Sequence, residues 1–173
     1  MTEDRIRLAE LKDAELLPGI ERSAGERFRQ IPELAWIADG DDLPVEHHLR
    51  LIPQRASWVV VDKQDHPIAF LSAEVLVKEL HIWEVSVRLD RQGTGIGRKL
   101  IQQAIQEAKV RGLAAVTLTT FRHVTWNETF YARLGFKTVN NQEAGDRLNQ
   151  ILRSEIERGF PAERRCAMRL TIR

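Results

Sequence analysis

Cysteine is almost absent from this chain, because Cys166 is the only one among its 173 residues. A single thiol cannot form an internal disulfide, which excludes a disulfide-stapled fold and fits a protein kept in a reducing cytoplasm. Its apolar neighbours Ala167 and Met168 favour a buried thiol over a catalytic one. We therefore expect a cytoplasmic protein stabilised by its hydrophobic core.

The chain also lacks long hydrophobic runs and any excess of charge. No apolar stretch approaches the roughly 18 residues of a membrane span, and residues 1–5 have neither the basic nor the apolar region of a signal peptide. The 26 basic residues nearly cancel the 25 acidic ones, so net charge indicates neither a nucleic acid nor a membrane as partner. With 43% hydrophobic residues, the length suits a single domain, 1–173.

Metal-ligand spacing is missing as well. His81 and His123 are isolated in the sequence, and the adjacent residues His47 and His48 have no Cys or carboxylate at ligand spacing. We therefore expect a site without a metal.

A glycine-rich stretch, Gly93-Thr94-Gly95-Ile96-Gly97, lies between a β-branched segment and a helical pattern. Glycines at every second position allow a turn with positive φ that directs successive amides at one point. The helix that follows adds its unpaired N-terminal amides and the positive end of its dipole. The stretch therefore predicts a pyrophosphate-binding corner.

The spacing excludes two common phosphate-binding loops. A Walker loop requires G-x-x-x-x-G-K-[ST], but Gly97 is followed by Arg98. A dinucleotide fingerprint would need a glycine at Arg98 and an acidic residue at the end of the next strand, where Thr119 and Thr120 stand. Neither nucleotide hydrolysis nor nicotinamide or flavin chemistry is expected.

The glycine-rich stretch, with Gln92 at its first position, resembles the Q/R-x-x-G-x-G/A element of the GNAT (GCN5-related) N-acetyltransferase superfamily. Asn127, Tyr131, Gly135 and Phe136 are similar to a second family signature. The resemblance implies an α/β fold with a mixed, mostly antiparallel sheet flanked by helices. It also implies acetyl transfer from acetyl-coenzyme A to a primary amine of a small molecule or peptide by direct attack.

The resemblance also implies roles for individual residues. The backbone N–H of Val85 would polarise the acetyl carbonyl, Asn127 would contact the coenzyme, and Tyr131 would protonate or hydrogen-bond the departing thiolate. Asn127 and Tyr131 are four residues apart, so they share one helical face. The residues expected to bind the coenzyme are Val85, Ser86, Val87, Gln92, Gly93, Thr94, Gly95, Ile96, Gly97, Arg98, Asn127 and Tyr131.

Two residues compete for the role of the base that takes the amine's proton. His81 has a suitable reference pKa of about 6.5. Glu84 is a carboxylate among apolar neighbours, which is expensive to bury without a partner. Strand alternation places the two on opposite faces, so the choice stays open. Weaker candidates for contact with the acceptor are Glu21, Phe28 and Trp36.

Hydrophobic periodicity predicts the order of the elements. The predicted strands are 5–9, 57–62, 68–77, 79–87, 115–120, one beginning at 137, and 166–172, an edge or central strand. The predicted helices are 13–29, 45–52, 97–112, one through Asn127 and Tyr131, and 143–158; residues 36–44 are expected to form a loop. The amphipathic helix 143–158 departs from the family pattern and should cover the sheet, the acceptor pocket or another subunit of a homodimer.

A second class of function also fits the glycine-rich stretch. A module that senses acyl-coenzyme A without turning it over would keep the pyrophosphate corner but would need neither base nor acid. Release of free coenzyme A in the presence of amines separates the two functions.

Overall fold

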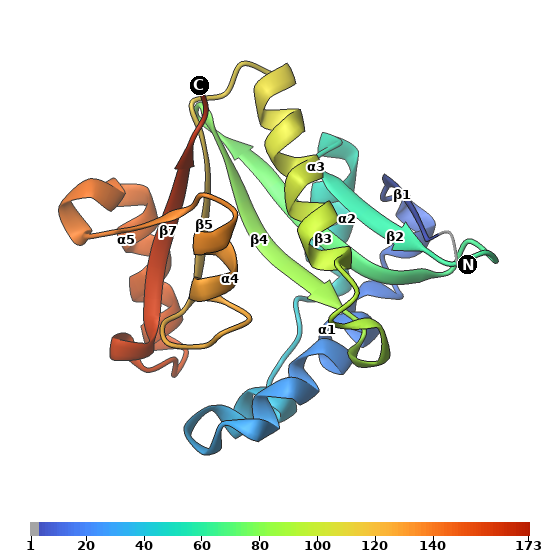
Figure 1. The fold of residues 1–173 in the computed structure, drawn as a ribbon, viewed down its shortest axis with the longest axis horizontal. Helices are drawn as coiled ribbons and strands as arrows, with labels where there is room; N and C mark the ends of the chain where they lie inside the picture. Colours follow the sequence, from blue (N-terminus) through green and yellow to red (C-terminus); the bar gives the residue numbers. More distant parts are fainter. Residues whose placement is uncertain (1–3) are drawn as a thin grey trace. The chain divides into compact units, whose positions relative to one another are not determined.

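The computed structural model describes residues 4–173, and these form a seven-stranded sheet in the order β1-β2-β3-β4-β5-β7-β6. The strands are β1 (Arg5–Leu8), β2 (Ser57–Val61), β3 (Pro67–Leu76), β4 (Glu79–Val87), β5 (Ala115–Phe121), β6 (Lys137–Val139) and β7 (Arg165–Thr171). β4 and β5 run parallel, whereas β1–β2, β2–β3, β5–β7 and β6–β7 are antiparallel. The predicted mixed, mostly antiparallel sheet flanked by helices is confirmed (Figure 1).

The α-helices are α1 (Leu17–Gly25), α2 (Val45–Leu51), α3 (Ile96–Val110), α4 (Glu128–Arg133) and α5 (Asn141–Glu157). Short 3-10 segments are η1 (Leu11–Asp13), η2 (Glu26–Gln30), η3 (Pro32–Asp39), η4 (Ile52–Gln54), η5 (Leu89–Arg91) and η6 (Ala162–Arg164). Between residues 4 and 173, no helix is both long and apolar enough to cross a membrane.

Contacts group the chain into two compact units. The first contains residues 4–74 and 83–104, and the second contains residues 75–82 and 105–173. The boundaries cut β3, β4 and α3, so each of these elements contributes to both units.

The core of the first unit lies between α1 and the strands β2 and β3. Leu17 and Ile20 of α1 pack in one buried cluster with Val59, Val61 and Phe70 of the strands. Each such side chain, when fully buried, contributes about 1.5–3 kcal/mol of hydrophobic free energy. This packing fixes α1, the helix that carries Glu21.

The region after α1 differs from the expected helix and loop. The α-helix ends at Gly25 and gives way to the 3-10 segments η2 and η3. Pro32 explains the break between them, because a residue before proline avoids the helical region, and Ile31 is extended with φ −113° and ψ 106°. The loop expected from residue 36 is wrong for 36–39, which belong to η3.

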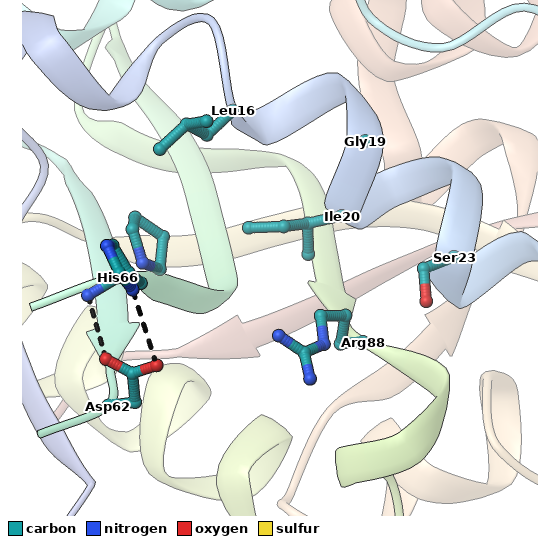
Figure 2. Close-up of a pocket in the computed structure, with 8 residues that line it drawn as sticks. Leu16, Gly19, Ile20, Ser23, Asp62, His66 and Arg88 are labelled. Atoms are coloured by element: carbon teal, nitrogen blue, oxygen red, sulfur yellow. Dashed lines mark hydrogen bonds and ion pairs between the residues drawn. The ribbon is translucent and has the colours of Figure 1, made fainter. Parts of the chain in front are cut away.

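A pocket of about 410 Å³ opens beside α1 (Figure 2). Its apolar lining comes from Leu16, Ile20 and Pro67. Its charged lining residues are held by neighbours, since Asp62 accepts the backbone N–H of His66 and Arg88 pairs with Asp90. None of the predicted site residues lines this pocket, and we assign it no reaction. The full lining is Leu16, Gly19, Ile20, Ser23, Asp62, His66, Pro67 and Arg88.

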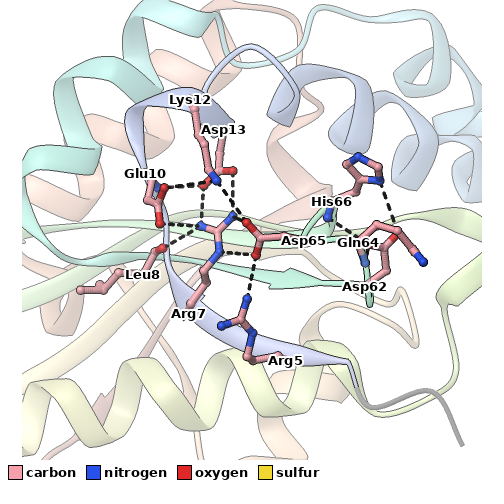
Figure 3. Close-up of polar contacts among 10 residues, drawn as sticks. All are labelled: Arg5, Arg7, Leu8, Glu10, Lys12, Asp13, Asp62, Gln64, Asp65 and His66. Carbon is pink, nitrogen blue, oxygen red and sulfur yellow. Dashed lines mark hydrogen bonds and ion pairs between the residues drawn. The ribbon is translucent and has the colours of Figure 1, made fainter.

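An ionic cluster around Arg7 joins β1 to the segment that leads into α1 (Figure 3). The Arg7 guanidinium donates to both carboxylate oxygens of Asp13, at 2.8 and 3.1 Å, and its Nε donates to Asp65 at 3.0 Å. Asp13 is only 1% exposed and also accepts the backbone N–H of Glu10. A bidentate pair of this kind has a fixed geometry, so it sets the path of the chain from β1 into α1.

In the second unit, α5 packs on the strands β5, β6 and β7 (Figure 1). Ala144 and Leu148 of the helix form a buried cluster with Ala167 of β7. The sequence left open what this helix covers, and the structure places it on its own sheet. β7 pairs with β5 on one side and β6 on the other, so it is a central strand.

α5 begins at Asn141, two residues before the expected start, and a capping box forms at its N-terminus. Asn140 accepts the backbone N–H of Glu143 at 2.8 Å, and the Glu143 carboxylate accepts the backbone N–H of Asn140 at 2.9 Å. The reciprocal bonds satisfy amides that the first helical turn leaves without a partner.

Candidate active site

The glycine-rich turn lies between η5 and α3, at the end of β4. Gly93 and Gly95 have φ values of 77° and 86°, in the left-handed region that favours glycine. Gly97 lies in the first turn of α3. The amides at the start of a helix have no carbonyl four residues before them to bond, and the dipole makes this end positive. The arrangement can bind an anion, as the spacing of the glycines predicts.

Side chains hold this turn in place. The Gln92 amide donates to the backbone carbonyl of Val87 at 2.9 Å, and the Thr94 hydroxyl donates to that of Arg91 at 2.7 Å. The backbone N–H of Leu89 donates to the Ser23 hydroxyl of α1 at 3.0 Å. From the sequence we expected Gln92 only as a contact of the coenzyme, so the tethering role of its side chain was missed.

The basic residues around the turn differ in whether their charges can interact with a bound anion. Arg91 is engaged in an ion pair with Asp4. Arg98 and Lys99 are exposed in the first turn of α3, where an anion at the helix end would lie near their charges.

Two carboxyl groups of the first unit act on each other, one from α1 and one from β4. Glu21 accepts the backbone N–H of Leu43 at 2.9 Å, and Glu84 accepts the hydroxyl of Ser86 at 3.0 Å. Burial and then the negative charge of Glu84 raise the pKa of Glu21 to about 9. Glu21 is therefore protonated at neutral pH. The two residues are far apart in sequence, yet the charge of Glu84 acts on Glu21 in the folded protein.

His81, the rival candidate for the base, lies in the second unit and is fully buried. Its Nδ1 is 3.0 Å from the hydroxyl of Thr117 on β5. Burial, with a smaller effect from the positive charge of Arg147, lowers the pKa of His81 to about 3. The imidazole is therefore neutral at physiological pH and packs as part of the sheet.

Phe28 and Trp36 lie on the 3-10 segments that follow α1. Phe28 is half-buried in η2, whereas Trp36 in η3 is 43% exposed. The Trp36 indole N–H donates to the backbone carbonyl of Glu33 at 3.1 Å, which fixes the ring on its own segment.

Asn127 and Tyr131 meet at the start of α4 in the second unit. Asn127 is the N-cap residue, and its backbone carbonyl accepts the N–H of Tyr131 at 3.0 Å. The Asn127 side-chain oxygen accepts the hydroxyl of Thr120 on β5 at 2.7 Å. The Tyr131 ring is half-buried between Phe130 and Phe136, with ring centroids 5.1 and 5.8 Å away. Asn127 has non-helical φ −124° and ψ −105° and precedes α4, so of the two residues expected on one helix only Tyr131 lies within it.

The remaining coenzyme candidates are on the final residues of β4. Val85 and Val87 are half-buried, and Ser86 is 2% exposed. Throughout residues 4–173, no group of three or more His, Cys, Asp or Glu side chains could hold a metal ion.

Comparison with known proteins agrees with this geometry. Residues 25–136 match the model of the acetyltransferase (GNAT) family. Peptidyl-lysine N-acetyltransferase YjaB of Salmonella typhimurium is 26% identical over 141 residues, which are 82% of this chain and 88% of the relative.

Solved structures share the fold. The PaiA N-acetyltransferase of Thermoplasma acidophilum, solved in complex with coenzyme A, is 16% identical with a TM-score of 0.71, covering 98% of this chain and 99% of that one. The ribosomal-protein-S18-alanine N-acetyltransferase of Escherichia coli is 18% identical with a TM-score of 0.68, covering 98% and 94% of the two chains. The family match extends over more than half of the sequence and includes both the glycine-rich turn and the α4 signature, so the chain belongs to the GNAT family of acetyltransferases.

Proposed function

We propose that this enzyme transfers the acetyl group of acetyl-coenzyme A to a primary amine of a peptide or small molecule. The observation that carries the proposal is the turn from Gln92 to Gly95 at the N-terminus of α3. It has the left-handed glycines and the unpaired helix amides that a pyrophosphate requires. The coenzyme complex of the PaiA relative supports the same donor.

We assign the base to Glu84. Glu84 shares its surroundings with a second carboxyl group from α1, the helix that we expect to line the acceptor site. His81 is fully buried, and its lowered pKa makes it a poor proton acceptor at neutral pH. In the reaction, Glu84 removes a proton from the acceptor ammonium, and the neutral amine attacks the thioester carbonyl.

We assign the remaining steps to the backbone of β4 and to α4. The N–H of Val85 would donate to the oxygen that becomes negatively charged in the tetrahedral intermediate. Tyr131 would donate a proton or a hydrogen bond to the coenzyme sulfur as the C–S bond breaks. Asn127 would contact the coenzyme. Phe28 and Trp36 would contact the acceptor, together with Glu21.

A protein acceptor is favoured by the relatives, because YjaB is a peptidyl-lysine N-acetyltransferase and the Escherichia coli neighbour modifies an alanine of a ribosomal protein. The test is to incubate the protein with acetyl-coenzyme A and a panel of lysine peptides, polyamines, free amino acids and arylamines. We expect acceptor-dependent release of free coenzyme A. Tight binding of acetyl-coenzyme A without release for any amine would contradict the proposal and support the sensing function.

A further inference from the structure

Asn127 is the N-cap residue of α4, but its side chain does not cap the helix. An asparagine at this position commonly uses its side-chain oxygen to accept a backbone N–H from the first helical turn. Here that oxygen accepts no N–H of α4, a helix that lies wholly within the described residues. It accepts the hydroxyl of Thr120 at 2.7 Å instead. A contact with β5 therefore takes the place of the cap.

The Thr120 hydroxyl is the buried partner in this contact. Thr120 is 3% exposed, so its hydroxyl proton is shielded from bulk water. A buried hydroxyl that lacks an acceptor is destabilising, and Oδ1 of Asn127 supplies that acceptor. The hydrogen bond therefore fixes the Asn127 side chain with its oxygen directed at Thr120.

The backbone of Asn127 is held without any help from Thr120. Its N–H donates to the carbonyl of Val124 at 3.0 Å, and its carbonyl accepts the N–H of Tyr131 at 3.0 Å. Val124 is itself buried, at 1% exposure. Loss of the Thr120 hydroxyl should therefore release the Asn127 side chain and leave the start of α4 in place.

The same hydrogen bond decides what Asn127 can offer a ligand. An amide side chain has one oxygen that accepts hydrogen bonds and one NH2 group that donates them. The oxygen is occupied by Thr120, whereas the NH2 group donates to no other group within residues 4–173. Asn127 is half-buried, so this NH2 group is the polar end that a ligand meets. The ligand atom opposite it must be an acceptor.

We propose that Thr120 is a positioning residue of the coenzyme site. Its hydroxyl holds Oδ1 of Asn127, so that the Asn127 NH2 group donates a hydrogen bond to an amide carbonyl oxygen of the pantetheine arm. This inference rests on the proposed function, in which Asn127 contacts the coenzyme. It adds Thr120 to the site and specifies which atoms of Asn127 and of the coenzyme meet.

Binding of acetyl-coenzyme A to Thr120 variants, measured by isothermal titration calorimetry, tests the proposal. Thr120→Val keeps the shape of the side chain and removes the hydroxyl, and we expect a ~3–10-fold weaker affinity, the effect of about one hydrogen bond. Thr120→Ser keeps the hydroxyl and should bind within about twofold of the wild type. Wild-type affinity in Thr120→Val, or an equal loss in Thr120→Ser, would overturn the proposal. So would a fall in Tm with unchanged affinity, because the contact would then serve the fold alone.

Variants of Asn127 test which of its atoms meets the coenzyme. Asn127→Asp keeps an oxygen for Thr120 but turns the NH2 group into an acceptor. Its affinity should fall at least tenfold, below that of Asn127→Ala, because two acceptors then face each other. Thr120→Val should weaken binding no further in the Asn127→Ala background. Wild-type affinity in Asn127→Asp, or losses that multiply in the double variant, would overturn the proposal.

Thr138→Val is the matched control. It removes a hydroxyl on β6 that donates to Glu128, the first residue of α4, at 2.8 Å. The variant therefore loses a threonine contact with the same helix but leaves Asn127 alone, and its affinity for acetyl-coenzyme A should equal that of the wild type. An affinity as low as that of Thr120→Val would overturn the specific role of Thr120.

Steady-state rates separate this inference from the function on which it rests. The amide carbonyl of the pantetheine arm does not react, so Thr120→Val should raise the KM for acetyl-coenzyme A by ~3–10-fold and leave kcat unchanged. A loss confined to kcat would overturn the inference. Weaker binding in Thr120→Val, in a protein that transfers acetyl to no amine, would support the coenzyme contact and contradict the proposed function. Normal transfer by the wild type with unchanged affinity in Thr120→Val would do the reverse.

Discussion

At the scale of single residues, Gly95 gives the most direct test of coenzyme binding. Its φ of 86° lies in the left-handed region, which residues with a side chain rarely adopt. No atom lies within 4 Å of the place that a Cβ would take, on the turn where we expect the pyrophosphate to bind. We predict that Gly95→Glu weakens binding of acetyl-coenzyme A at least tenfold, about 1.4 kcal/mol, because it adds strain and a negative charge. Isothermal titration calorimetry measures this change.

Gly112 is a matched control for Gly95. It lies just beyond the other end of α3 with a φ of 66°, and its side-chain position is equally open. Gly112→Glu should therefore introduce similar strain and the same charge but leave the affinity for acetyl-coenzyme A unchanged. Equal losses of affinity in the two variants would mean that strain, and not the ligand site, explains the effect at Gly95.

A second prediction at this scale concerns Tyr131. Tyr131→Phe retains the ring between Phe130 and Phe136 and removes only the hydroxyl. We expect kcat to fall by roughly 10-fold to 10³-fold, within the range of general acid catalysis, with little change in coenzyme affinity or Tm. If the hydroxyl only stabilises the fold, Tm will drop while turnover per folded molecule stays constant.

At the scale of elements, a buried ion pair joins α5 to β7. Glu155 and Arg165 are 7% and 10% exposed, and the Arg165 Nε donates to Glu155 at 2.8 Å. The second Glu155 oxygen accepts the hydroxyl of Thr119. The Arg165 guanidinium lies 4.4 Å from the ring centroid of Phe121. The cluster anchors the C-terminal part of α5 to the strands it covers.

We predict that Glu155→Gln lowers the free energy of unfolding by about 3–5 kcal/mol, because it leaves the Arg165 charge buried without its counter-ion. Replacing both partners, Glu155→Leu with Arg165→Met, should recover most of this loss. The exposed pair of Arg29 and Asp39 is the control, and Asp39→Asn should change stability by only about 0–1 kcal/mol. Urea unfolding of the four proteins measures these differences; equal effects of Glu155→Gln and Asp39→Asn would contradict the prediction.

Elements also show what the sequence could and could not predict. The strands of the sheet and the helix α3 could be predicted from hydrophobic periodicity, because their apolar residues recur at the spacing of a strand or of a helix. The 3-10 segments after Gly25 were missed, since the apolar spacing continues through them although α1 has ended and Pro32 separates η2 from η3. The effect of the Glu84 charge on Glu21 has no local signal, because the two residues are far apart in the sequence. The site roles remain predictions that the proposed variants test.

At the scale of the whole molecule, we predict that two buried histidines and the half-buried Glu21 give the free energy of unfolding a maximum within the physiological pH range. Burial lowers the pKa of His48 to about 4 and that of His81 to about 3, from an ordinary value of 6.5. Below pH 6.5 both histidines are therefore protonated in the unfolded chain but not in the folded protein. The free energy of unfolding therefore falls as the pH decreases. Glu21 acts in the opposite sense. Its pKa rises from 4.5 to about 9, so its contribution is lost as the pH rises through this range.

Summed over the three groups, the unfolded chain binds one proton more than the folded protein between pH 4.5 and 6.5, and one proton fewer between pH 6.5 and 9. Each such proton changes the free energy of unfolding by about 1.4 kcal/mol per pH unit. We predict maximal stability near pH 6.5, measured by urea unfolding across pH 4.5–9. Glu21→Gln should remove most of the alkaline decline, and a maximum near pH 9 in the wild type would contradict the pKa shifts.

β7 is the last strand of the second unit to be synthesised, although it lies between β5 and β6 in the sheet. β5 and β6 leave the ribosome before β7, yet β7 is the strand that pairs with both of them. Until it is synthesised, each of the two earlier strands has an open edge that can bind another extended chain. Late insertion between distant segments also makes folding slow, because the loops must close before the contacts form. Nascent chains stalled before residue 165 should therefore depend on chaperones far more than chains released after residue 171.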